Sequence, residues 1–397
     1  MKNKKTTSYL LGIYVISYFT WKWASFLPIF SIAIASVAVL LLFFNRPRVT
    51  KEFLILVAYT ILVGVIYKFF VNDNRYYFVI DNCIKILIIL LYGLYFERLE
   101  KNEKAKHLKI AMFGYVITDI STLISSIIDP EIVRRTAYKS VRSPILLGIG
   151  GYDYIYGLII LNITIFAYLQ RGMIAERKKW VWFVVLNTAT IVMSGFTTAT
   201  VFVLLFFALA FVYEGKIKAF IITILSAVAY SQIVPILLFL SKLSFLPSLL
   251  TSRLLQFAYY LNGTGTQLYF ISTEGSRGQR MLRSWEAFKQ HPLFGSFIAN
   301  DYSNLGEHTE WVDRLAQFGI IVFLLIAVFW LFQYKQTIKQ NRTCKSYHQA
   351  VTLSYLYFLV LGFFNPNSYP SIVFPLLIVM PNLWCLFGGK EDESTYS

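Results

Sequence analysis

Arginine and histidine side chains gather in one part of this 397-residue chain, residues 275–319. Three arginines stand within seven positions of one another, at Arg277, Arg280 and Arg283, and His291 and His308 follow them. A planar guanidinium group can bind two oxygen atoms of one anion, and a histidine can accept a proton near neutral pH. The stretch is therefore suited to holding an anion and moving a proton.

The arginines fall on a segment with helical spacing. In residues 279–290, Met281, Trp285 and Phe288 recur at i, i+4 and i+7 and share one helical face, whereas Arg280 and Arg283 point elsewhere. We therefore expect an amphipathic helix here, with an apolar face and a basic one.

A second set of charged residues follows His308. Glu310, Asp313 and Arg314 have the i, i+3 and i+4 spacing of residues that share a helix face. On such a face they can orient His308, or they can form an ordinary solvated ion-pair surface. The spacing alone fits both interpretations.

The composition places these residues in a membrane protein. Apolar residues make up 57% of the chain and charged residues only 15%, which leaves too little polar surface for a water-soluble fold. Scanning for runs long enough to cross a bilayer predicts twelve transmembrane helices. They fall at residues 9–20, 26–44, 53–71, 76–96, 108–128, 152–169, 180–195, 198–213, 220–240, 317–332, 350–364 and 371–387.

The distribution of cations predicts the orientation of these helices. Alternate connectors are rich in lysine and arginine, whereas the short connectors on the other side hold only Lys22 and Arg75. By the positive-inside rule, the rich connectors and both termini are cytoplasmic. This pattern accounts for the net charge of +16 without a nucleic-acid partner.

The predicted fold is thus an all-α polytopic membrane protein with one integral domain, residues 1–397. A basic extracytoplasmic loop covers 129–151, a large extracytoplasmic loop with amphipathic helices covers 241–316, and 388–397 form a cytoplasmic tail. Aromatic residues are frequent in the large loop, so we expect it to fold against the outer surface of the membrane.

The motifs in the large loop resemble those of a known family. An arginine-containing helix is followed by Pro292-Leu293-Phe294-Gly295, and then by His308-Thr309 with Asp313, Ala316 and Gly319 at the spacing H-T-x-x-x-D-x-x-A-x-x-G. This order, just before a span, is similar to the O-antigen polymerase and O-antigen ligase superfamily, Wzy-type proteins included. The likeness covers residues 277–321 and extends to Arg142 with the glycines and tyrosine after it.

The resemblance implies an enzyme and a substrate class. It implies a metal-independent, inverting glycosyltransferase that needs no cofactor and joins undecaprenyl-diphosphate-linked repeat units into a surface polysaccharide (O-antigen, capsule or exopolysaccharide). The site faces outward from the bacterial cytoplasmic membrane. Undecaprenyl-diphosphate-linked glycans and membrane lipids are the expected partners, together with a flippase and a chain-length regulator.

The resemblance also implies roles for particular residues. His308 is expected to act as the base, with Glu310 and Asp313 as the other catalytic residues. The arginines expected to bind the diphosphate are Arg142, Arg277, Arg280 and Arg314. One departure from the family is that Ser194-Gly195 is followed by Phe196-Thr197-Thr198, without the arginine that the family often has in this turn.

Simpler interpretations of the same residues stay open. The arginines can pair with Glu274, Glu286 or Asp313 or touch lipid headgroups, and His308 can be an ordinary surface histidine. His107, His291 and His348 are expected to be structural. Metal-ligand spacing is absent from the outer segments, so no metal site is predicted.

Three other functions compete with polymerisation. A ligase would transfer finished glycan to another acceptor with the same residues. A flippase or transporter would use charges near the membrane midplane, such as Asp81, Lys85 and Asp119, although mutual pairing is their simplest explanation. In a scaffolding subunit, the polar loop residues would be replaceable.

Overall fold

The computed structural model is built of helices, and no β-strand occurs among the residues that it describes. Those residues are 2–22, 28–45, 49–69, 76–135, 148–213, 215, 233–244, 246, 248–261, 277–296, 305–306, 309–341 and 344–387. The all-α fold predicted from the sequence is confirmed for this part of the chain.

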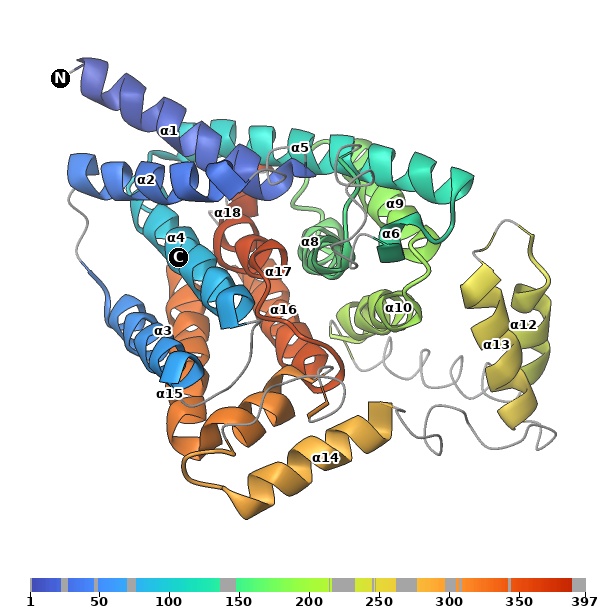
Figure 1. Ribbon diagram of the computed structural model, residues 1–397. Helices are drawn as coiled ribbons and strands as arrows, with labels where there is room; N and C mark the ends of the chain where they lie inside the picture. The colour runs from blue at the N-terminus through green and yellow to red at the C-terminus, as the bar shows by residue number, and fades with distance from the viewer. Residues whose placement is uncertain are drawn as a thin grey trace.

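Most of the predicted apolar runs lie within described helices (Figure 1), whereas residues 220–232 of the predicted span 220–240 are outside the described residues. The first half contains α1 (Lys2–Thr20), α2 (Pro28–Asn45), α3 (Lys51–Phe69), α4 (Tyr76–Phe96), α5 (Lys101–Ile128), the short α6 (Ile132–Arg135), α8 (Tyr152–Gln170) and α9 (Arg177–Met193). The second half contains α10 (Thr197–Val212), α12 (Ile233–Ser241), α13 (Ser248–Leu261), α14 (Arg277–Gln290), α15 (Glu310–Gln340), α16 (Lys345–Phe364), α17 (Pro370–Phe374) and α18 (Met380–Asn382).

Three of the described helices are long and apolar enough to cross a membrane: α5, α8 and α15. Two shorter apolar stretches, Thr197–Val212 and Pro370–Leu386, accompany them. The second stretch contains a π-helical segment, Pro375–Val379, and ends in a 3-10 turn, Leu383–Leu386. The three long helices thus have the length and apolarity of helices in membrane proteins.

Helix α8 is the most enclosed of the three long helices. It packs against α9, α10, α16 and α17, and Figure 1 shows it nearly end-on among them. A side chain at Gly157 would collide with the backbone carbonyl of Ser371, so this glycine allows α17 to approach α8 closely. Two glycines with positive φ, Gly172 and Gly195, reverse the chain after α8 and after α9.

Helices α15 and α16 pack side by side and run in opposite directions. The Tyr347 hydroxyl donates to the Thr337 carbonyl at 2.7 Å, and the Trp311 indole donates to the Leu359 carbonyl at 2.7 Å. The start of α15 therefore lies beside the end of α16. α15 is not continuous, because Gly319 has the non-helical angles φ 69° and ψ 177° and breaks it.

The charged residues within the apolar helices find partners nearby. Lys85 pairs with Asp81 at 2.6 Å, as their spacing predicts. Asp119 is buried and pairs with a tyrosine instead of a lysine: the Tyr154 hydroxyl donates to its Oδ1 at 2.8 Å. The three cysteines, Cys83, Cys344 and Cys385, are free.

Candidate functional site

The arginine helix predicted from the sequence is α14, which packs against α15 with Ser284 buried, while Met281 and Trp285 of its apolar face stay 39% and 43% exposed. The predicted segment 279–290 falls within Arg277–Gln290. Trp285 and Phe288 pack together on this helix, with ring centroids 5.3 Å apart. α14 thus lies across the beginning of a membrane-length helix, at the bottom of Figure 1.

A buried cluster of hydrogen bonds fixes α14 to α15. The Ser284 hydroxyl of α14 donates to Asp313 Oδ1 at 2.6 Å. Thr309, the residue before α15, donates its backbone N–H to Asp313 Oδ2 at 3.1 Å and its hydroxyl to Oδ1 at 3.0 Å. Because Asp313 is only 2% exposed, these bonds form away from water and hold the two helices in one arrangement.

Gly306 completes this cluster. Its backbone N–H donates to the Ser284 hydroxyl at 2.9 Å. A side chain here would come within 2.9 Å of Asp313 Oδ1 and 3.1 Å of both the Arg280 carbonyl and the Ser284 hydroxyl. Glycine therefore lets the chain pass between the two helices without displacing these groups. We name Ser284, Gly306, Thr309 and Asp313 the Asp313 junction.

The turn after α14 fits into the break in α15. The Ile320 N–H, which lacks a helical partner because of the break, donates to the Pro292 carbonyl at 2.9 Å. On the other side of the break, the Ala316 carbonyl accepts the Ser296 N–H at 2.8 Å. The 292–295 turn thus satisfies backbone groups that Gly319 releases from the helix.

Glu310 and Arg314 form a nearly buried ion pair. Arg314 Nε lies 3.0 Å from Glu310 Oε1, and the side chains are 15% and 7% exposed. A terminal nitrogen of Arg314 donates to Gln317 Oε1 at 3.4 Å, and its guanidinium lies 5.7 Å from the centre of the Phe318 ring. The acidic partner of this arginine is therefore Glu310, whereas Asp313 of the same helical segment belongs to the junction.

The other predicted site residues lie in several places. Arg280 and Arg283 are half-buried on α14, and the backbone of Arg277 starts that helix. The side chain of Arg277 is outside the described residues, as are His308 and Arg142. The structure thus brings Arg280, Glu310, Asp313 and Arg314 to the region where α14 meets α15.

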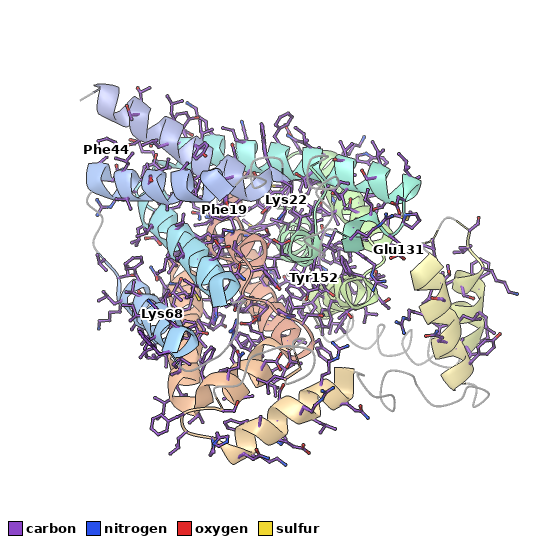
Figure 2. All side chains as sticks on the ribbon, in the orientation of Figure 1. Phe19, Lys22, Phe44, Lys68, Glu131 and Tyr152 are labelled. Atoms are coloured by element: carbon purple, nitrogen blue, oxygen red, sulfur yellow. The ribbon has the colours of Figure 1, made fainter. Side chains whose placement is uncertain are left out.

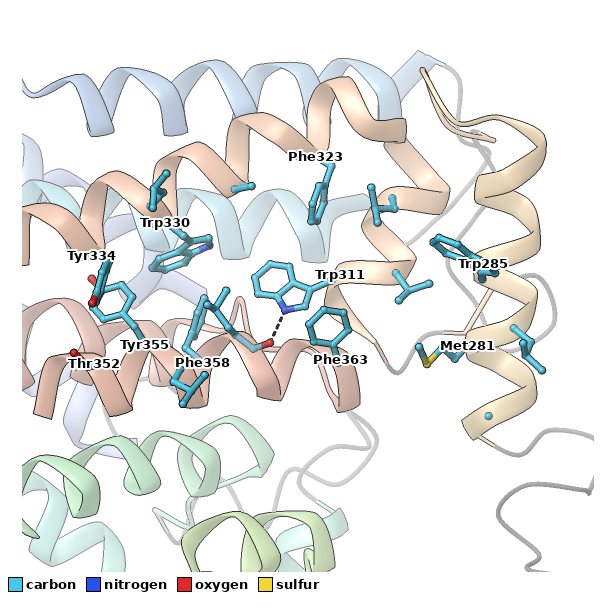
Figure 3. A pocket seen from close by; sticks show the side chains of 18 residues that line it. Met281, Trp285, Trp311, Phe323, Trp330, Tyr334, Thr352, Tyr355, Phe358 and Phe363 are labelled. Atoms are coloured by element: carbon cyan, nitrogen blue, oxygen red, sulfur yellow. Dashed lines mark hydrogen bonds between the residues drawn. The ribbon is translucent and has the colours of Figure 1, made fainter. Parts of the chain in front are cut away.

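A long apolar groove begins at α14 and runs along α15 and α16, with a volume of about 960 Å³. Figure 3 shows Met281 and Trp285 of α14 at one end of it, and Tyr334 and Tyr355 at the other. It is lined by Gly278, Met281, Leu282, Trp285, Trp311, Val312, Leu315, Phe323, Ala327, Trp330, Leu331, Tyr334, Thr352, Tyr355, Leu356, Phe358, Leu359 and Phe363.

The groove is open to the side. Six of its lining residues are at least 42% exposed: Leu282, Trp285, Leu331, Leu356, Leu359 and Phe363. Along α15, the stretch from Phe323 to Tyr334 rises about 16 Å, roughly half of the hydrocarbon thickness of a bilayer. The groove is thus long, apolar and accessible from the surroundings of α15 and α16.

Together these elements can bind an amphiphile with an anionic head. A charged head fits beside α14, which carries Arg280 and Arg283, and an apolar tail fits the groove that starts on the other face of the same helix. The Asp313 junction and the 292–295 turn keep the two parts in register.

Neither the groove nor the hydrogen bond from Ser284 to Asp313 was predicted from the sequence. The groove requires α16 to lie beside α15, and residue spacing within one helix carries no information about that pairing. Ser284 has no distinguishing feature in the sequence, because its importance comes from Asp313, 29 positions away. The one indication of the groove in the sequence was that Met281 and Trp285 share a helical face.

Comparison of the chain with protein-family models and with curated proteins gives no match, so membership of a family remains a prediction from its motifs.

Proposed function

We propose that this protein is a polymerase that joins undecaprenyl-diphosphate-linked oligosaccharide repeats at the outer face of a bacterial cytoplasmic membrane. The observation that carries this proposal is the groove of about 960 Å³ that starts at the arginine helix α14. A polyprenyl diphosphate has a long apolar chain and a doubly charged head, and the groove and α14 offer a matching place for each.

The proposed reaction is a displacement at the anomeric carbon of the donor glycan. A hydroxyl oxygen of the acceptor attacks this carbon and forms the new glycosidic bond. The bond from the carbon to the diphosphate breaks, and undecaprenyl diphosphate leaves with the bonding electron pair. The hydroxyl proton passes to His308 as the base. A single displacement of this kind inverts the anomeric centre, without a metal ion or cofactor.

Arginine side chains suit the departing group in this reaction. Negative charge develops on the diphosphate as the bond breaks, and guanidinium groups held in place stabilise that charge. Arg280 is the main candidate for binding the diphosphate. Arg277 and Arg142 are further candidates. Arg314 contributes less net charge because Glu310 lies 3.0 Å away. Asp313 acts by holding α14 in position.

The proposal includes a topology. Twelve helices cross the membrane, both termini lie in the cytoplasm, and residues 129–151 and 241–316 are the outer loops. This orientation places α14 where lipid-linked repeats arrive after a flippase has moved them outward. A chain-length regulator is a further expected partner.

Two rival functions are distinguished by what they do with the donor. A ligase uses the same donor site and differs in its acceptor. A transporter would move the lipid-linked glycan without breaking its bond to the diphosphate. Against transport, Lys85 is paired locally with Asp81, and the buried Asp119 accepts a hydrogen bond from Tyr154.

The direct test is a reconstituted assay. Purified protein in liposomes is given undecaprenyl-diphosphate-linked repeats, and glycans are separated by length. We expect a ladder of products with one undecaprenyl diphosphate released per linkage. Single transfers to an added non-polymeric acceptor would show a ligase, and movement across the bilayer without released diphosphate would show a transporter; either would refute polymerisation.

A further inference from the structure

Aromatic side chains from three separate elements meet at the start of α8. The Tyr152 ring centroid lies 5.6 Å from that of Phe196, just before α10, and 5.9 Å from that of Tyr369, just before α17. Tyr156, one turn along α8, lies beneath, with its ring centroid 4.6 Å from that of Tyr152. We name Tyr152, Phe196 and Tyr369 the aromatic platform.

The platform is partly exposed, whereas its support is buried. Tyr152, Phe196 and Tyr369 are each half-buried, and Tyr156 is 1% exposed. Part of each of these three residues is therefore accessible, and they rest on a buried base. Tyrosines that anchor a protein in the membrane interface lie on its lipid-facing perimeter. These residues instead surround the start of α8, which is the most enclosed of the long helices.

Polar groups border the platform. Lys22, at the end of α1, donates to Ser371 Oγ at 2.7 Å and lies 3.2 Å from Asp153 Oδ2. Figure 2 labels Lys22 and Tyr152, which both lie near the start of α8. Asn365 donates its amide to the Tyr156 hydroxyl at 3.2 Å. Ring faces with hydrogen-bonding groups at their edge form a surface for a ligand that is both apolar and hydroxylated.

The loop beside the platform leads to the mouth of the groove. Asn367, two residues before Tyr369, donates its amide to the Phe358 carbonyl at 2.7 Å. A side chain on Gly362 would meet both the Trp311 indole of the groove wall and the Asn367 amide. The Asn367 side chain is buried, and its amide thereby ties the loop before Tyr369 to α16.

We propose that the aromatic platform binds the acceptor glycan, an inference that rests on the proposed polymerase function. A sugar ring has faces of C–H groups that pack against the negative face of an aromatic ring, and hydroxyls around its edge for the neighbouring amide and carboxylate groups. The donor then lies by α14 and the groove, and the acceptor lies across the Asn365–Tyr369 loop from it. Two separate sites allow two lipid-linked glycans to be held at once.

The test measures binding and transfer separately. The probe is the host's own repeat unit, released from its lipid, and the variants are Tyr152→Ala and Tyr369→Ala, with Tyr369→Phe as a conservative change. We expect alanine to weaken binding of the released glycan roughly tenfold and to raise the acceptor KM similarly, while the donor KM is unchanged. Phenylalanine should restore most of the binding, because it keeps the ring.

The matched control is Tyr213→Ala, which removes an exposed tyrosine at the other end of α10 and should change neither value. Equal glycan binding by wild type, Tyr152→Ala and Tyr369→Ala would overturn the inference, even if wild type polymerises lipid-linked repeats. Platform-dependent glycan binding without any transfer by wild type would support the glycan site while refuting the polymerase.

Discussion

Gly295 and Gly319 lie against each other's backbone, and each has a positive φ, 81° and 69°. A side chain on Gly319 would collide with the Leu293 carbonyl, and one on Gly295 would collide with the Gln317 carbonyl. The turn after α14 and the break in α15 are therefore one structural unit. Through it, the arginine helix has a defined position relative to the groove.

Replacing Gly319 by alanine should destabilise this unit. The Gly319 backbone is in a region that is nearly restricted to glycine, and the added carbon also collides with the 292–295 turn. We expect a loss of roughly 2–5 kcal/mol of local stability. It should appear as faster hydrogen exchange in residues 280–296 and a lower unfolding temperature in detergent.

Gly172→Ala is the matched control for this change. Gly172 also has a positive φ, 70°, but no atom lies within 4 Å of a side chain placed there. The Gly172→Ala protein should lose only the part of the stability that comes from the strained backbone conformation, about 1 kcal/mol. Equal effects of the two substitutions would show that the contact between the turn and the helix break contributes nothing.

The sequence predicted the elements of this fold better than their relationships. Apolar runs and helical spacing located α14 and the described apolar helices, because those patterns are local to one helix. The break at Gly319 was not predicted. A glycine within an apolar run is tolerated in a helix, and only the approach of Leu293 and Gly295 explains why this one is not helical.

Contacts within one helix of the candidate site were predictable from the sequence, whereas contacts between helices were not. The i, i+4 spacing of Glu310 and Arg314 allowed an ion pair as one of two interpretations, and the structure contains this pair, nearly buried instead of solvated. Asp313, the residue directly before Arg314, bonds to Ser284 and Thr309 instead. Which partner an acidic residue takes depends on the element packed against it, and one helix's sequence does not contain that information.

The Asp313 junction should show strong coupling between its members. A double-mutant cycle of Ser284→Ala and Asp313→Asn should give an interaction energy of about 1–3 kcal/mol, because both groups are buried and 2.6 Å apart. Thermal unfolding of the four proteins in detergent measures it. The exposed pair Glu176 and Lys179, 3.4 Å apart, is the comparison and should give less than about 0.5 kcal/mol.

Arg280→Ala should abolish long polysaccharide chains without preventing membrane insertion. One charge on an outer helix contributes little to the packing of the spans, whereas loss of a guanidinium at a developing diphosphate charge costs roughly 10²-fold or more in rate. Chain length in cells and protein in the membrane fraction are the two measurements. Arg280→Lys should recover only part of the activity, because it lacks the planar fork.

Arg177→Ala is the control for the arginine experiment, since Arg177 is exposed at the start of α9, which does not line the groove. It should leave chain length unchanged. Normal chain length in the Arg280→Ala strain, at wild-type protein levels, would exclude this arginine from the site.

Filling the groove should impair use of long-chain donors. Ala327→Trp adds a large side chain among Phe323, Trp330 and Leu331, and it should raise the KM for an undecaprenyl donor roughly tenfold or more. A donor with a short prenyl chain should be affected less, because it occupies less of the groove. Val201→Trp, on the exposed face of α10, is the control and should change neither KM. A uniform effect on both donors would argue against a groove for the lipid chain.

The most direct measurement of the donor site is photo-crosslinking with an undecaprenyl diphosphate that carries a diazirine in its prenyl chain. We expect labelled peptides from α15 and α16 around Trp330 and Leu356, with labelling reduced by unlabelled undecaprenyl diphosphate. Labelling confined to α5 and α9 around Asp119, or spread evenly over lipid-facing helices and insensitive to competitor, would contradict the proposed donor site.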